Sequence, residues 1–282
     1  MWLWWVLACS GDRDPIVPES WSATKIAQTR GLSGLARDPD GTLWAVGERD
    51  ATLRTLDGQK ALPIEGIPEG LDTESVAFLG PNRVVFGTES MDPDRTSETL
   101  LVGQVESDRV LVVERWALPT RVLGAPAEAN RGLEAVCTTP VGLVAATEVV
   151  IQKDGSRWAP IAWRPLSGGT WTRGRVRLST ETGKLAGLAC SGDQIYAIER
   201  HYGIAVLLNF SLTGSAIEPR AAPLHPLIGG TLPNLEGLEV FDSTVVLISD
   251  NDSGGLSGPT WRFDLPLEGL YSSAEAAAGA SP

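Results

Sequence analysis

Residues 234–252 read NLEGLEVFDSTVVLISDND. Two short apolar runs, Leu235–Val240 and Val245–Ser249, flank a polar turn, which is the pattern of a β-hairpin. A carboxylate, Glu236, opens the first run, and another, Asp250, closes the second. In an antiparallel hairpin the start of one strand lies beside the end of its partner. We therefore expect both carboxylates at the same edge of a sheet.

The same hairpin pattern occurs in five places along the chain. Each copy has an apolar run, a turn containing Gly, Pro or Asp, and a second run that ends in an acidic residue. The copies open at Ser33, Glu74, Glu134, Ala186 and Glu236 and end at Glu48, Glu89, Glu148, Glu199 and Asp250. A spacing of roughly 40–60 residues is expected of propeller blades. The sequence therefore predicts an all-β fold, a β-propeller with five blades, or with six if the long interval between Glu89 and Glu134 holds another.

The pattern also predicts the domain organisation. The 282 residues are 43% hydrophobic and 21% charged, which is enough for a sizeable core. Because the repeats run through nearly the whole chain, we expect one propeller domain over residues 21–271. Its first strand, Trp21–Thr29, is expected to complete the last blade and remove its open edge. Residues 10–20 are expected to form a tether, and residues 272–282 a disordered tail.

The first nine residues, MWLWWVLAC, form a very short apolar run that ends in a cysteine. This run resembles a bacterial lipoprotein signal over residues 1–9, in which Cys9 is the lipidated residue. The alternative is an exposed N-terminus with a cysteine there by chance. The run is too short to span a bilayer. We therefore expect a protein of the bacterial cell envelope, in the periplasm or at the surface, with a lipid anchor as its only membrane contact.

Two other cysteines, Cys137 and Cys190, lie near the far ends of the first strands of consecutive copies. In an oxidising compartment the two could form a disulfide. The sequence favours the alternative, two separate buried thiols that pack as small apolar residues. Spacing along the chain does not decide between these interpretations.

The net charge is −12, which argues against a nucleic-acid partner and suits a surface that binds cations. A closed ring of repeats would bring the acidic positions to one mouth of the central channel. Carboxylates at close range need countercharge. Calcium, which takes several oxygen ligands, is one source. The basic residues beside the acidic positions are another, namely Arg49, Arg131, Lys184 and Arg200. A purely structural interpretation is that each acid caps a hairpin by accepting backbone N–H groups.

Five short motifs carry a resemblance to a known family: GLSGL at 31–35, DTESV at 72–76, GLEAV at 132–136, NLEGL at 234–238 and SDND at 249–252. In this order they resemble the phytase-like (esterase-like activity of phytase) family of secreted bacterial propellers, over roughly residues 31–252. The resemblance implies a propeller with an acidic central face that hydrolyses phosphate or carboxylic esters with calcium. It also implies that Glu74, Glu134 and Glu236 are the motif acids and that Glu48, Glu89, Glu148, Glu199 and Asp250 are the acids at strand ends. Ser33 and Ala186 depart from the pattern, and the lack of a rich basic cluster argues against phytate itself.

Two functions are compatible with these observations. The first is a calcium-dependent hydrolase of small esters or phosphoesters, in which His201 acts as a general base together with Glu199. We expect the metal to be held by Glu48, Glu74, Glu89, Glu134, Glu148, Glu236 and Asp250, and the substrate by Arg49, Arg131, Arg200 and Asn251. The second is a non-catalytic propeller that binds an envelope ligand and has a structural acidic ring. The small number of bases and nucleophiles favours this second function. In both cases we expect a monomer.

Overall fold

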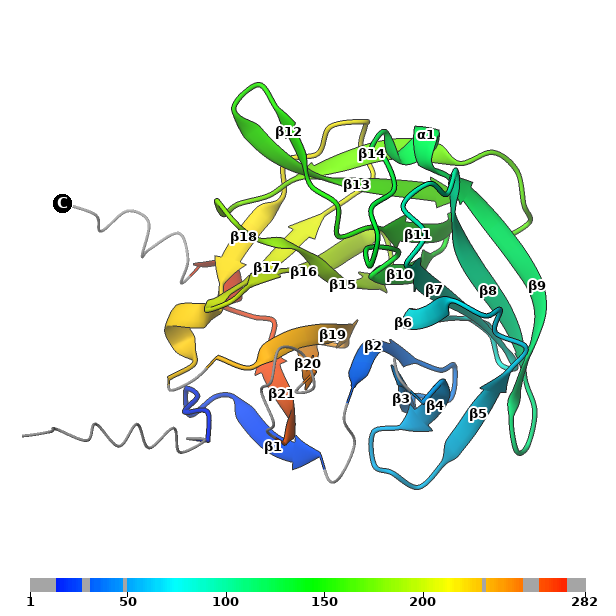
Figure 1. The fold of residues 1–282 in the computed structure, drawn as a ribbon. Helices are drawn as coiled ribbons and strands as arrows, with labels where there is room; N and C mark the ends of the chain where they lie inside the picture. Colours follow the sequence, from blue (N-terminus) through cyan, green and yellow to red (C-terminus); the bar gives the residue numbers. More distant parts are fainter. Residues whose placement is uncertain (1–13, 27–30, 48–49, 230–231, 251–258, 273–282) are drawn as a thin grey trace, which may run out of the picture.

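The structure is a computed structural model that describes residues 14–26, 31–47, 50–229, 232–250 and 259–272. Its strands form successive antiparallel meanders around a central axis (Figure 1). Each repeat begins with the strand nearest the axis and continues outward. The predicted all-β propeller is confirmed.

The first two repeats are joined along their outer edges. The first consists of β2 (Leu32–Arg37), β3 (Leu43–Gly47), β4 (Thr52–Thr55) and β5 (Ala61–Glu65). The second consists of β6 (Leu71–Gly80), β7 (Arg83–Ser90), β8 (Ser97–Val105) and β9 (Val110–Pro119), followed by the short helix α1 (Thr120–Leu123). A parallel pairing of β5 with β9 joins the two meanders into one eight-stranded sheet. The long interval between Glu89 and Glu134 thus holds β8, β9 and α1, which continue the second repeat.

The next two repeats form separate sheets. The third contains β10 (Ala135–Thr139), β11 (Gly142–Ala146), β12 (Ile151–Lys153), β13 (Ser156–Arg164) and β14 (Thr172–Arg177). The fourth contains β15 (Lys184–Ser191), β16 (Gln194–His201), β17 (Ile204–Phe210) and β18 (Arg220–Pro223), and the 3₁₀-helix η1 (His225–Leu227) follows. The strand β18 lies in a Pro-rich segment, residues 217–227, and forms the outer edge of its sheet. An edge strand tolerates Pro223 because a proline there removes no hydrogen bond from the middle of a sheet.

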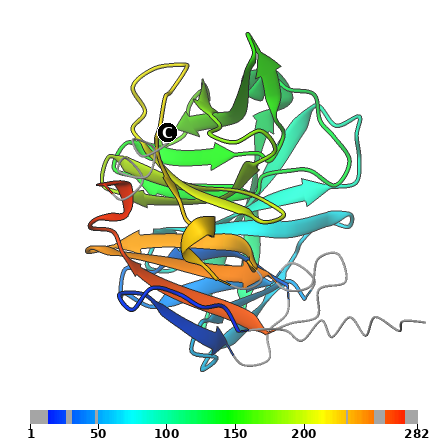
Figure 2. The same ribbon diagram turned by 90° about the vertical axis from the view of Figure 1, so that its left-hand side faces the viewer.

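The last sheet combines both ends of the propeller. It contains β19 (Asn234–Phe241), β20 (Thr244–Asp250) and β21 (Thr260–Pro266), with β1 (Ser22–Ile26) paired antiparallel to β21. Figure 2 shows the dark blue β1 beside the orange-red β21. The N-terminal strand therefore covers the outer edge of the last sheet, as predicted.

The inner strands β2, β6, β10, β15 and β19 contact one another in a closed ring. The hydrophobic core is divided into five clusters, each between two neighbouring repeats. In the smallest, Leu32 and Ala45 of the first repeat pack against Val246 and Ile248 of the last. This division follows from the strand period of two, because alternate side chains face the repeats on either side.

Small residues allow the inner strands to approach closely. The residue that follows each acidic motif position is Gly34, Ser75, Ala135, Gly187 or Gly237. A Cβ on Gly187 would lie 2.4 Å from the carbonyl oxygen of Glu236, and one on Gly34 would lie 2.5 Å from the Cα of Ser75. A larger side chain at these positions would force neighbouring repeats apart.

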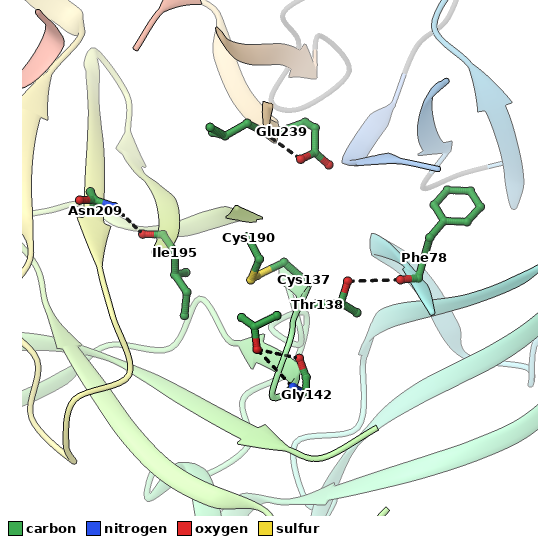
Figure 3. The surroundings of a disulfide bond; sticks show 10 residues. Phe78, Cys137, Thr138, Gly142, Cys190, Ile195, Asn209 and Glu239 are labelled. Carbon is green, nitrogen blue, oxygen red and sulfur yellow. Dashed lines mark hydrogen bonds between the residues drawn. A yellow bond between two sulfur atoms is a disulfide. The ribbon is translucent and has the colours of Figure 1, made fainter. Parts of the chain in front are cut away.

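Cys137 on β10 and Cys190 on β15 form a disulfide, with their Cα atoms 5.5 Å apart (Figure 3). The favoured interpretation of two separate thiols is therefore wrong. The bond joins inner strands of consecutive repeats, and the distance between those strands is set by packing that spacing along the chain does not reveal.

Several predictions fall on residues that the structure does not describe. The signal at residues 1–9, Cys9 and nearly all of the tail at 272–282 lie outside the described ranges. Within the predicted tether, Ile16 exchanges backbone hydrogen bonds with Gly229. In the described part of the chain, no helix combines the length and the apolar character that a membrane span requires.

Candidate active site

Four of the five inner strands lose their regular register at the position of the acidic motif residue, and the exception, β10, begins one residue after Glu134. The pairing of β6 with β7 shifts at Glu74, that of β19 with β20 at Glu236, and that of β15 with β16 at Ala186. In the first repeat the shift falls between Leu32 and Leu35. A β-bulge of this kind turns a side chain out of the regular alternation. In these four repeats a β-bulge thus orients the side chain at the equivalent position.

The acids at the ends of the second strands lie at the same edge, as the hairpin geometry predicts. Glu89 pairs with Asp72 at the start of β6, and Asp250 pairs with Asn234 at the start of β19. The described acids of this edge are each at most 7% exposed: Glu74, Glu89, Glu134, Glu148, Glu199, Glu236 and Asp250. Acidic side chains are almost never so buried unless they are paired or bind a cation.

Three of these acids meet at one point. Carboxylate oxygens of Glu89, Glu134 and Glu148 all lie within 4.8 Å of one another. They come from the end of β7, the residue before β10 and a position after β11. Burial and the charges of Glu236 and Glu89 raise the pKa of Glu134 to about 8, against the opposing effect of Lys184 and Arg200. Burial is the largest cause of this shift, and Glu236 and Glu89 add negative charge around Glu134.

Basic residues of this edge offset part of that charge. Lys184 forms an ion pair with Glu148, and Arg200 forms one with Glu236. The guanidinium of Arg131 lies 3.8 Å from Glu148. Burial, together with the charges of Arg200 and Arg131, lowers the pKa of Lys184. Lys184 and Arg200 start and end the inner hairpin of the fourth repeat, so this hairpin supplies the cations for both of its neighbours.

Ser33, the first departure from the acidic pattern, takes part in the site in another way. Its hydroxyl donates a 3.1 Å hydrogen bond to Glu74 of the next repeat, and both side chains are buried. A serine at the acidic position can thus donate a hydrogen bond to a neighbouring carboxylate. The sequence pattern did not reveal this role, because the donor and the acceptor belong to different repeats.

Glu199, predicted to be catalytic, is hydrogen-bonded to the segment that precedes β15. It accepts hydrogen bonds from the backbone N–H and hydroxyl of Ser179 and from the backbone N–H and hydroxyl of Thr180. The side chain is fully buried. These bonds connect β16 to the segment that leads into β15, and they use both carboxylate oxygens. Ser179 and Thr180 were not among the predicted site residues.

His201, the predicted base, lies at the end of β16 and is partly buried. Its ring contacts the exposed Tyr202 edge to face, with ring centroids 5.1 Å apart. Together with Arg200 these residues line a cavity of about 220 Å³ whose other walls include Leu232 and Pro233. The cavity borders the Arg200–Glu236 ion pair and has an apolar side.

Three further predicted site residues, Glu48, Arg49 and Asn251, lie outside the described residues. Asn234 was not among the predicted site residues, but it belongs to the site, because its side-chain amide donates a 2.9 Å hydrogen bond to Glu236. The motif NLEGL contains both residues, so the pair could have been noticed from the sequence.

The arrangement defines a β-propeller with an acidic mouth on its axis, and solved structures share the propeller fold. The chain aligns with the PQQ-bound aldose sugar dehydrogenase of Streptomyces coelicolor at 13% identity and a TM-score of 0.50, over 88% of this chain and 99% of that one. It aligns with the glutaminyl cyclase of Myxococcus xanthus at 12% identity and a TM-score of 0.53, over 88% and 95%. At this identity the likeness concerns the fold alone.

The family follows from the sequence match. The phytase-like family, described as esterase-like activity of phytase, matches residues 48–253, which is most of the chain. The chain therefore belongs to this family, as its motifs indicated. A search among curated proteins finds no match to it.

Proposed function

We propose that the acidic mouth is a hydrolytic site for small esters or phosphoesters that works with a bound calcium ion. The observation that supports it best is the convergence of Glu89, Glu134 and Glu148. Two ligands on opposite sides of one calcium ion are about 4.8 Å apart, since each bond is about 2.4 Å long. The separations among these oxygens fit one shared ion, and carboxylates are the hard ligands that calcium prefers.

Glu89, Glu134 and Glu148 would hold the ion, and Glu236 lies close enough to Glu134 to affect its charge. When bound, calcium supplies a Lewis acid that polarises the ester and lowers the pKa of water. Side chains of the protein would bind and orient the substrate. Arg131 and Arg200 would bind the anionic part of a phosphoester, since guanidinium groups match phosphate oxygens in geometry and charge.

The cavity beside Arg200 suggests where the rest of the substrate lies. Its volume of about 220 Å³ and its walls of Leu232, Pro233 and Ile204 suit a small apolar group. His201 lines the same cavity and would exchange a proton with the leaving group or water. Because Glu199 is bound to Ser179 and Thr180, we give it a structural role in this proposal.

The test is hydrolysis of an aryl acetate and an aryl phosphate with and without a chelator, together with calcium titration by calorimetry. Wild type should turn over at least one substrate, lose activity with the chelator and recover it with calcium. Glu134→Gln should lose both calcium binding and activity. Glu114→Gln, a substitution in a half-exposed ion pair on β9, is the matched control and should retain both. Activity that survives the chelator would rule out the metal role.

A second function, a non-catalytic binding propeller, is favoured by one observation. Glu148 and Glu236 already form ion pairs with Lys184 and Arg200, so part of the acidic ring is balanced within the protein. A protein of this kind would bind calcium or remain unaffected by it, and would hydrolyse neither substrate. For either function the disulfide suits an oxidising compartment, in agreement with the proposed location in the cell envelope.

A further inference from the structure

The opposite end of the ring contains a larger cavity, of about 550 Å³, between the far ends of the five inner strands. The channel between this cavity and the acidic mouth is closed by a ring of buried apolar side chains at equivalent positions: Leu35, Val76, Val136, Leu188 and Leu238. The space among them leaves no room for a water molecule. The cavity is therefore separate from the acidic mouth.

Glu239, which lines this cavity, differs in chemical type from the residues at the equivalent position of the other four repeats. The position after the apolar ring is Ala36, Ala77, Cys137, Ala189 and Glu239 in the five repeats. The three alanines and the disulfide cysteine are buried, as a packed position next to the axis requires. Glu239 is half-buried at this position, so its carboxylate loses part of its hydration, a cost that an alanine does not have. The other repeats show that the fold itself does not require an acid at this position.

The Glu239 carboxylate lines the cavity across from the Cys137–Cys190 disulfide (Figure 3). Its oxygens accept one hydrogen bond from the backbone N–H of Arg37, at 2.9 Å, and one from the backbone N–H of Val240, at 3.0 Å. Burial raises the pKa of Glu239 to about 7, against the opposing effect of these two hydrogen bonds and of the Arg37 charge. The Arg37 guanidinium lies over the ring of Phe241, 4.7 Å from its centre.

The charged residues that line the cavity indicate whether its ligand is a cation or an anion. Asp38 is engaged in its own turn, where it accepts hydrogen bonds from the backbone of Asp40 and Thr42 and from the Trp44 indole. Asp242 is exposed at the tip of the β19–β20 hairpin. Among the described residues that line the cavity, three acids thus stand against one base, Arg37. An anionic ligand would meet a negative wall, whereas a cation would offset the charge of Glu239.

We propose that this cavity binds a small organic cation that places a primary ammonium group against the Glu239 carboxylate. A metal ion is a poorer occupant, because it needs several oxygen ligands and the Asp38 oxygens are already bonded within the turn. An ammonium group needs fewer partners than a metal ion, because it has only three hydrogen-bond donors, whereas calcium takes about six to eight oxygen ligands. The volume of about 550 Å³ is within the usual range for small-molecule sites.

The experiment is calorimetric titration of the full chain with butylamine and benzylamine, with benzyl alcohol as the neutral analogue. At least one amine should bind wild type with one-to-one stoichiometry and at least tenfold more tightly than benzyl alcohol. Glu239→Gln should weaken amine binding at least tenfold. Glu134→Gln changes the acidic mouth and should leave amine binding unchanged. Thermal melting of each variant verifies that it is folded.

Three results would overturn the proposal. The first is that neither amine binds wild type, as expected if Glu239 serves only to join β19 to β2 through Arg37. The second is equal amine affinity in wild type and Glu239→Gln. The third is loss of amine binding in Glu134→Gln with binding retained in Glu239→Gln, which would place the amine in the acidic mouth. None of these results depends on hydrolysis, so failure here and failure of the proposed function remain distinguishable.

Discussion

Lys184, at the start of β15, donates a hydrogen bond from its ammonium group to Glu148, which belongs to the preceding repeat. Glu148 is also one of the three carboxylates that converge near Glu134. The same carboxylate therefore serves as a partner for a lysine and as a candidate ligand for a cation. This double use makes Lys184 a competitor of any ion that binds in the acidic mouth.

Replacement of Lys184 by methionine should tighten calcium binding several-fold, because it removes a partly buried positive charge from the site and removes the ion pair of Glu148 with Lys184. Calorimetric titration measures the change. Lys153→Met, at an exposed position of β12, is the matched control and should bind calcium as wild type does. Weaker binding in Lys184→Met would mean that the ammonium group holds Glu148 in place for the ion.

Replacement of Glu199 by glutamine should destabilise the protein without abolishing hydrolysis. Ser179 donates to one carboxylate oxygen and Thr180 to the other, and the amide nitrogen that replaces one of these oxygens in glutamine cannot accept the two hydrogen bonds made there. The loss of hydrogen bonds to a buried acceptor costs about 1–3 kcal/mol of unfolding free energy. Denaturant melts measure the change, with Glu181→Gln, at an exposed position, as control. If a folded Glu199→Gln protein lost its activity, Glu199 would regain the catalytic role that the sequence predicted.

Replacement of Gly187 by alanine should lower the unfolding free energy by about 1–3 kcal/mol, the usual cost of overpacking. The added Cβ would lie 2.4 Å from the Glu236 carbonyl, where only a shift of the backbone can relieve the contact. Gly80→Ala, whose Cβ meets nothing within 4 Å, is the control and should be nearly neutral. Equal melting of both variants would contradict the close approach of β15 and β19.

The pKa of about 7 for Glu239 predicts a dependence of stability on pH. An unfolded glutamate has a pKa of about 4.3. Between these pH values the folded state holds a proton that the unfolded state has lost, so this residue makes the protein less stable as pH rises from about 4.3 to 7. The slope is at most about 1.4 kcal/mol per pH unit.

The variant Glu239→Ala removes this contribution and should therefore gain stability over wild type at pH 8, and much less at pH 5. Denaturant melts at the two pH values measure the difference. Equal effects of the substitution at both values would show that Glu239 does not titrate in this range.

Reduction of the Cys137–Cys190 disulfide should lower the melting temperature, because the bond closes a loop with a sequence separation of 53 residues. Loop-closure entropy sets an expected effect of about 4 kcal/mol at most. Melting with and without a reductant measures it, and a Cys137→Ala/Cys190→Ala double variant should melt like the reduced wild type. If the reductant also destabilised the double variant, its effect would not come from the disulfide.

Much of the fold could be predicted from the sequence because it depends on local patterns. Alternating apolar residues and turns such as Asp38-Pro-Asp-Gly41 define the hairpins, and their recurrence predicts a propeller. Antiparallel pairing then places Glu236 and Asp250 at one edge. Even the role of Trp21–Thr29 follows, because a sheet with an open edge needs another strand to cover it.

The relationships between repeats required the tertiary structure. The meeting of Glu89, Glu134 and Glu148, the pairing of Lys184 with Glu148, and the disulfide all join residues of different repeats. Their distances depend on how closely the inner strands pack around the axis, and that packing depends on small residues whose contacts lie far away along the chain. The sequence therefore determined which side chains stand at each edge of a sheet, whereas the closure of the ring decided which of them touch.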